Sequence, residues 1–181
     1  MRRLCAELLS GLNLPGPVHP DALFTALCAG MSRRHDRPVS HRLVSFPAGT
    51  VSGLWVATDA QHLVLCEKDT APDHQLVILG HELWHLEEHH RADPALSTAE
   101  AAPLLAPGTT HAALRRLAAR TAFCDHDETA AETFGSLLGS RARKWLAQEA
   151  HDSLHQAPVS GLVQRLEASL GPQHPQGPVR A

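Results

Sequence analysis

The residues with the clearest chemical potential lie near the middle of the chain, in the stretch LVILGHELWHLEEHH. Within it, His81, Glu82 and His85 form the pattern H-E-x-x-H, in which the two histidines of a zinc peptidase bind the metal and the glutamate acts as a base. A chain with 14 His among 181 residues can also produce this pattern by chance. The motif therefore predicts a metal site only if the neighbouring elements place its residues correctly.

The spacing of the motif suits a helix. Residues four apart on an α-helix lie on one face, so His81 and His85 can bind one ion through imidazole nitrogens about 2.0–2.1 Å away. Glu82 is rotated by about 100° and lies beside the ion. From there it can take a proton from a water molecule on the metal and pass it to a leaving amine. A catalytic zinc site of this kind needs a third protein ligand from elsewhere.

Candidates for the third ligand occur in the stretch DHDETAAETF, on a second predicted helix. Glu128 and Glu132 are four residues apart and can both face the motif helix. Two His and one carboxylate form a ligand set that catalytic zinc sites use. Asp125, His126 and Asp127 are nearby alternatives. Because the helix dipole alone favours an acid in a first turn, the residues leave the choice among these candidates open.

The elements before the motif follow from hydrophobic periodicity. Apolar residues at helical spacing predict helices over residues 2–12 and from about 20 to 30, followed by the polar link SRRHDRP. Alternating residues then predict a strand over 39–46. A hairpin follows over 51–69, with its turn at residues 58–61.

The motif falls in the second half of a long predicted helix that ends near residue 90. Thr70 is the expected N-cap, Pro72 suits the first turn, and Asp73 occupies the place of a capping-box acid. H-E-x-x-H is therefore expected on a helix, as the chemistry requires. The apolar residues that sustain the helical period are Leu76, Val77, Leu79, Leu83, Trp84 and Leu86.

The second half of the chain is predicted to be mainly helical. Residues 91–109, rich in Ala and Pro, are expected to form a long loop, and residues 110–120 a helix. A strong helix is predicted over 125–148, with Asp125 as its cap and Gly139 as a weak point. A last amphipathic helix is expected over residues 160–171.

Composition limits the class of protein. An apolar fraction of 43% and a charged fraction of 19% in 181 residues suit one globular domain, expected over 1–170 with a disordered tail at 171–181. The net charge of −3 and scattered basic residues argue against direct nucleic-acid binding. No apolar run approaches the ~20 residues of a membrane span, and no secretory signal is visible. We therefore expect a cytoplasmic protein whose four cysteines, without a C-x-x-C pair, are reduced.

The segment over residues 50–140 resembles the ImmA/IrrE family of bacterial metallopeptidases. The resemblance rests on the glycine-led strand of the hairpin, the H-E-x-x-H helix, and the later stretch ETAAETFG, which fits E-x-x-A-[NDE]-x-[FL]-[AG]. It implies an α+β, zincin-like fold in which a small antiparallel or mixed sheet packs on several helices. It also implies one zinc ion held by His81, His85 and Glu128, with Glu82 as general base. Glu132 is then an alternative ligand or a contact of a ligand.

The resemblance also implies a function. Members of this family typically act on helix-turn-helix repressors in stress responses, mobile elements or toxin–antitoxin-like pairs. We therefore expect a soluble zinc endopeptidase that cleaves such a partner, whose chain can lie extended along a sheet edge. The alternative is a zinc-stabilised binding module that sequesters a repressor or antitoxin without cutting it. A weaker third reading is a metal-dependent hydrolase of small molecules.

One departure from many zinc peptidases is the absence of tyrosine. Such enzymes often use a Tyr or His to donate a hydrogen bond to the developing oxyanion. Nothing in the sequence selects among the histidines that could do so, and Trp84, expected in the core together with Trp55, is a further candidate for substrate contact. The candidate histidines are His89, His90, His126 and His151.

Overall fold

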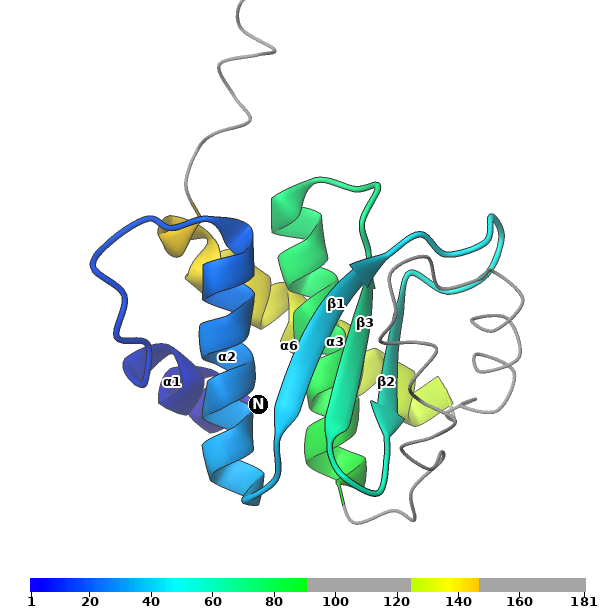
Figure 1. The fold of residues 1–181 in the computed structure, drawn as a ribbon, viewed down its shortest axis with the longest axis horizontal. Helices are drawn as coiled ribbons and strands as arrows, with labels where there is room; N and C mark the ends of the chain where they lie inside the picture. The colour runs from blue at the N-terminus through cyan, green and yellow to red at the C-terminus, as the bar shows by residue number, and fades with distance from the viewer. Residues whose placement is uncertain (91–124, 147–181) are drawn as a thin grey trace, which may run out of the picture. The chain divides into compact units, whose positions relative to one another are not determined.

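The described part of the computed structural model comprises residues 1–90 and 125–146, and it has an α+β fold (Figure 1). Predictions for residues 91–109, 110–120, 160–171 and 171–181, and for the end of the domain at 170, lie outside the described residues. The strands are β1 (Val39–Val44), β2 (Gly53–Ala57) and β3 (His62–Glu67). The helices are α1 (Arg2–Ser10), α2 (Pro20–His35), α3 (Pro72–His89) and α6 (Asp125–Ala142), followed by the short 3₁₀ helix η1 (Arg143–Trp145).

The three strands form a mixed sheet in the order β1-β3-β2. β2 and β3 are the predicted hairpin, paired antiparallel, while β1 pairs parallel with β3. The Thr58 N–H donates to the Gln61 carbonyl at 2.8 Å and closes the hairpin turn. The prediction of the hairpin and its turn is confirmed. Among the described residues, β2 has a neighbouring strand on one side only, so its other side is a sheet edge.

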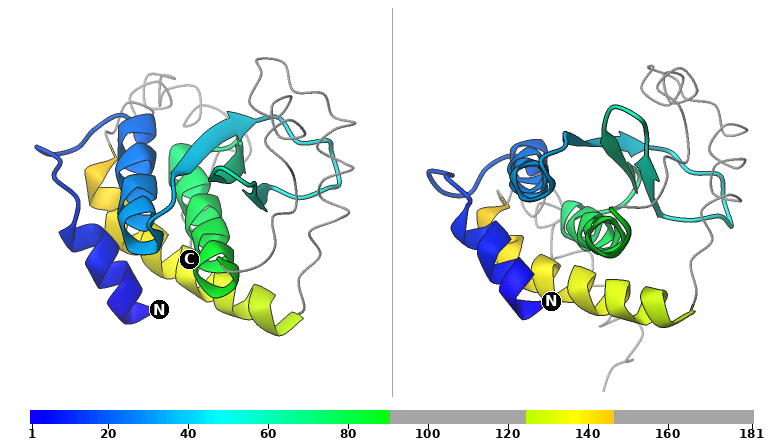
Figure 2. Two further views of the ribbon diagram at one scale, coloured as in Figure 1. Left: turned by 60° about the horizontal axis from the view of Figure 1, so that its bottom comes forward. Right: turned by 90° about the horizontal axis from the view of Figure 1, so that it is seen from below.

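Helix α3 lies between the sheet and α6. Seen from below, the sheet, α3 and α6 follow one another as layers, and α1 packs beside α6 (Figure 2). The face of α3 that makes this possible carries Leu76, Leu79, Leu83 and Leu86, all fully buried. Each such side chain contributes roughly 1.5–3 kcal/mol by leaving water. The motif helix is therefore fixed by the core on the faces next to its functional residues.

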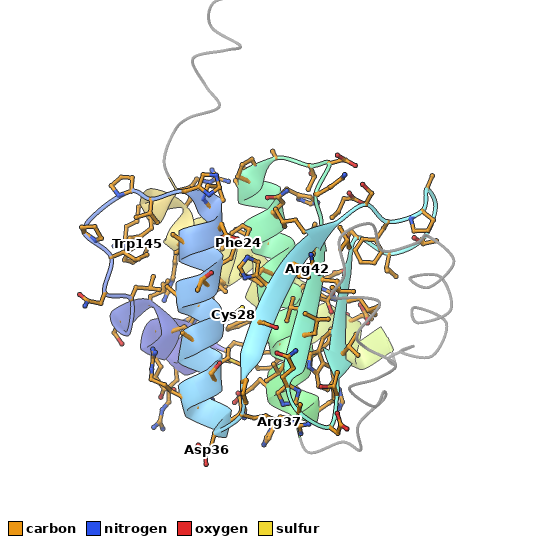
Figure 3. All side chains as sticks on the ribbon, in the orientation of Figure 1. Phe24, Cys28, Asp36, Arg37, Arg42 and Trp145 are labelled. Carbon is orange, nitrogen blue, oxygen red and sulfur yellow. The ribbon has the colours of Figure 1, made fainter. Side chains whose placement is uncertain are left out.

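Helix α2 differs from its prediction. It continues through the expected polar link to His35 because Met31 extends its buried face, and it ends at Asp36, whose φ of 50° is left-handed (Figure 3). Gly30, expected to end the helix, instead allows α1 to approach, since a Cβ there would lie 2.9 Å from Leu8 Cδ2. A glycine inside a helix can thus serve packing rather than termination.

The start of α3 also differs from its prediction. The N-cap is Ala71 rather than Thr70, and no side chain caps the helix. Pro72 occupies the first turn as expected, where its missing N–H costs nothing. The buried Gln75 donates to the carbonyls of Glu67 and Lys68 at 3.2 and 3.0 Å. The helix is therefore anchored to the end of β3 by Gln75 instead of a capping box.

Two expectations about environment concern the described residues. No described helix is long and apolar enough to cross a membrane. Cys5, Cys28 and Cys66 are buried and unpaired, as predicted, whereas Cys124 lies outside the described part. Burial raises the pKa of the Cys28 thiol to about 12, so this side chain stays protonated and behaves as a small apolar residue.

Candidate metal centre

The two sequence motifs meet where α3 crosses α6 at very short range. A Cβ on Gly135 would lie 2.6 Å from the Val77 carbonyl oxygen and 3.0 Å from the His81 backbone nitrogen. A Cβ on Gly80 would lie 3.0 Å from the Gly135 Cα. Only glycine allows two helix backbones to come this close without a clash. Gly139, predicted as a weak point, faces the Val77 side chain, because a Cβ there would lie 2.6 Å from Val77 Cγ2.

This crossing brings three potential metal ligands together. The Nε2 atoms of His81 and His85 lie 3.0 Å apart. Glu128 places Oε2 3.3 Å from His81 Nε2 and Oε1 3.4 Å from His85 Nε2. Ligand atoms of a tetrahedral zinc ion with bonds of about 2.0–2.1 Å are about 3.3–3.4 Å apart. The donor set and its spacing therefore fit a zinc ion, and this is the one such group among the side chains that the structure describes, those of residues 1–90 and 128–146.

Glu82 lies beside this group in a buried position, with only 6% of its surface exposed. The Trp55 N–H, on the free edge of β2, donates to Glu82 Oε2 at 2.8 Å. Burial raises the pKa of this carboxyl group to about 8, and the nearby charge of Glu128 acts in the same direction, while the Trp55 hydrogen bond opposes them.

Gly53 provides the space that the Glu82 carboxylate occupies. A Cβ on Gly53 would lie 2.5 Å from Glu82 Oε1 and 2.6 Å from Ile78 Cγ2. The start of β2 can thus lie directly against α3 only because this residue is glycine. The glycine at the head of the strand was noted in the sequence, but its contact with the candidate base could not be read from it.

A cavity of about 770 Å³ opens beside the metal group. One wall is formed by residues 50–54, at the start of β2 and just before it. The opposite wall belongs to α3 and α6, and it includes the candidate ligands and Glu82. The remaining residues of this second wall are His74, Val77, Ile78, Glu132 and Ser136. The metal group is therefore accessible to a ligand the size of several amino-acid residues.

The other candidates from the sequence are placed less centrally. Glu132 lines the cavity but does not belong to the metal group. The His89 ring stacks on His85 at 6.4 Å between centroids, and Trp84 packs on Phe134 at 5.1 Å. Neither His89 nor Trp84 lines the cavity.

The remaining candidate histidines lie away from the cavity or outside the described part, and a histidine that was not a candidate lines the cavity. The side chain of His126 and the whole of His151 lie outside the described part, while the His90 ring lies 4.3 Å from that of His35. His74, which the sequence analysis did not consider, lines the cavity. Its spacing of seven residues before His81, two helical turns on the same face, was the signal that could have found it.

Comparison of the chain with protein-family models, with curated proteins and with solved structures gives no match. Similarity to the ImmA/IrrE family therefore stays a prediction that rests on the two motifs and their order.

Proposed function

We propose that the chain is a zinc-dependent endopeptidase of zincin-like fold, related to the ImmA/IrrE family, which cleaves a protein substrate such as a helix-turn-helix repressor. The observation that carries this proposal is the meeting of His81, His85 and Glu128, whose donor atoms lie within 4.8 Å of one another. They come from helices far apart in the sequence, and the buried acid Glu82 lies next to them. A purely structural zinc site has no use for that acid.

The residues divide the catalytic work. Zinc held by the two histidines and Glu128 would supply Lewis acidity, which activates water and polarises the substrate carbonyl. Glu82 accepts the proton of the attacking water and then delivers it to the leaving amine. The Trp55 N–H holds one oxygen of Glu82 at 2.8 Å, so the carboxylate has a fixed orientation for both transfers.

The position of β2 supports an extended protein substrate. The Ser52 carbonyl accepts a hydrogen bond from the Glu67 N–H of β3, at 2.8 Å. Because backbone groups alternate in direction along a strand, the polar groups of Gly53 point to the opposite side, where the cavity lies. A substrate strand can pair there, which favours a peptide over a small molecule as substrate.

A second candidate function is a zinc-stabilised module that sequesters its partner without cutting it. It is favoured by the placement of His89 and Trp84, which do not line the cavity, so that among the described histidines outside the metal group only His74 could donate a hydrogen bond to an oxyanion there. The two functions share the metal site and differ in the role of Glu82.

The test compares the zinc-loaded wild type with Glu82→Gln and with Glu88→Gln, which changes an exposed acid outside the cavity. Zinc content is measured by mass spectrometry, and cleavage is measured on a peptide library prepared from a bacterial proteome. We expect full zinc in all three proteins, cleavage by the wild type and Glu88→Gln, and at least a 100-fold loss in Glu82→Gln. Equal cleavage by Glu82→Gln would overturn the mechanism, and no cleavage by the wild type would favour the sequestering module.

A further inference from the structure

Some of the residues that line the cavity lie on α3 before the metal group and on α6 after it; we call them the acidic end and define it by His74, Val77, Glu132 and Ser136. The direction of α6 explains its position. Gly135 packs on Val77 and the His81 backbone, so α6 runs from the metal group toward the start of α3. Each turn of α6 past the metal group is about 5.4 Å farther along the cavity.

Glu132 is the only charged side chain that lines the acidic end. It is one turn beyond Glu128 and does not belong to the metal group. Among the residues that the structure describes, no Lys or Arg lines the cavity and no ion pair involves Glu132. A divalent ion held by His81, His85 and Glu128 would offset the negative charge closest to it, that of the metal group and its neighbour Glu82. Glu132, at an exposed position of the cavity wall, then has no cation beside it among the described residues.

The neighbours of Glu132 suit the stem of a long basic side chain. Val77 is half-buried and presents an apolar surface, and the Ser136 hydroxyl can accept a hydrogen bond. Lys and Arg commonly lay their methylene groups along such apolar surface while the charged head meets an acid. A neutral or acidic side chain would leave the Glu132 charge unpaired or repelled.

We propose that the acidic end is a subsite for a Lys or Arg side chain of the protein substrate, and that Glu132 is the residue that selects it. This inference rests on the proposed function, because it concerns the peptide that the metal group would cut. An extended chain advances about 3.3 Å per residue, so one helical turn corresponds to about two residues. The basic residue therefore lies within two residues of the scissile bond.

A basic subsite agrees with the proposed class of substrate. Proteins that bind DNA use Lys and Arg to neutralise phosphates, so their surfaces and recognition helices are rich in these residues. The described part of the cavity wall carries Glu132 and no Lys or Arg, so it selects such a segment over an acidic one by electrostatic complementarity.

The cleavage test uses four zinc-loaded proteins and a peptide library cut from a proteome with chymotrypsin, so that Lys and Arg occur at every position. The proteins are the wild type, Glu132→Gln, Glu132→Lys and the control Glu88→Lys. We expect wild type and control to enrich Lys or Arg roughly fivefold at one position within two residues of the cut. Glu132→Gln should lose this enrichment and Glu132→Lys should favour Asp or Glu there. A wild type that cuts without basic preference, or a Glu132→Lys protein that keeps it, overturns the subsite and leaves the endopeptidase intact.

A binding measurement separates failure of the subsite from failure of the proposed function. Zinc-loaded Glu82→Gln protein is applied to an array of library peptides, each paired with a copy in which norleucine replaces Lys. We expect the Lys copies to be retained roughly fivefold better, and the added Glu132→Gln change to remove that difference. If the Lys copies are retained better but the wild type cleaves no peptide, the subsite proposal stands and the endopeptidase proposal is wrong. Equal retention of both copies overturns the subsite.

Discussion

Glu128 and Glu132 lie one helical turn apart on α6, yet only Glu128 belongs to the metal group. Glu128 and Glu132 have the same side chain on the same face of α6, and the sequence alone leaves open which of them is a ligand. Their distances differ decisively, because Glu128 reaches His81 and His85 at 3.3 and 3.4 Å whereas Glu132 does not join the group. The crossing of α6 over α3 makes this distinction, and it cannot be read from helical spacing.

The first residue-scale prediction follows from this difference. Glu128→Ala removes one of the three proposed zinc ligands and is expected to weaken zinc affinity by at least about 100-fold. Glu132→Gln leaves the three proposed ligands in place and is expected to keep the wild-type affinity. Affinity is measured by competition with a chromophoric chelator. Similar zinc affinity in Glu128→Ala and the wild type would show that another residue completes the site.

Among the elements, the crossing of α3 and α6 brings the residues of the two sequence motifs together in one candidate site. Gly80 and Gly135 lie against each other, with a Cβ on Gly80 only 3.0 Å from the Gly135 Cα. The final position of the motif E-x-x-A-[NDE]-x-[FL]-[AG] is occupied by Gly135, so a small residue there has a packing reason. The close approach sets how far Glu128 can reach across to the histidines.

Gly135→Ala tests this crossing. Alanine gains about 1 kcal/mol of helix propensity over glycine. Its Cβ would, however, lie 2.6 Å from the Val77 carbonyl oxygen, a backbone atom that cannot rotate away. Overpacking of this kind typically costs 1–3 kcal/mol, so we expect a net loss of stability together with weaker zinc binding. Urea unfolding with and without zinc measures both.

The control for this substitution is Thr133→Ala, at an exposed position on the same helix. Thr133 donates only to the Thr129 carbonyl of its own helix, at 2.8 Å, and alanine is the better helix former. Stability and zinc affinity should therefore stay at or slightly above those of the wild type. A Gly135→Ala protein that behaves like this control would mean that the two helices do not need their close approach.

Local patterns predicted the elements better than their ends. The hairpin and the motif helix follow directly from periodicity, because strand and helix periods differ and the turn at Thr58 has its own signal. The end of α2 was wrong because Gly30 serves packing against α1, and the cap of α3 was wrong because Gln75 bonds across to the end of β3. Both errors arise from contacts between elements, which single-segment patterns do not contain.

At the scale of the whole molecule, the elements also bury a histidine that must stay neutral. His62, at the start of β3, is only 1% exposed, and its Nδ1 accepts a hydrogen bond from the Trp55 indole N–H at 3.4 Å. Burial lowers the pKa of His62 to about 4, and the charges of Arg37, His35 and His90 act in the same direction. These residues come from the end of α2, the segment before β1 and the end of α3, so protonation of His62 opposes the assembly of all three with the sheet.

The last prediction concerns stability against pH. An unfolded histidine has a pKa of about 6.5, so between pH 6.5 and 4 the unfolded chain binds a proton at His62 that the folded chain does not. Above pH 6.5 the free energy of unfolding therefore keeps the full contribution of neutral His62. As the pH is lowered, it falls by up to about 3 kcal/mol near pH 4. Urea unfolding of zinc-free protein measures this, because the metal ligands would add their own pH dependence.

His62→Gln separates the contribution of this side chain from those of the other histidines. Glutamine does not titrate in this range, so the difference in unfolding free energy between wild type and variant should narrow by up to about 3 kcal/mol from pH 7 to pH 4. A constant difference for His62→Gln across this range would mean that His62 accepts its proton in the folded protein, and that the ends of α2 and α3 tolerate a buried charge beside Arg37.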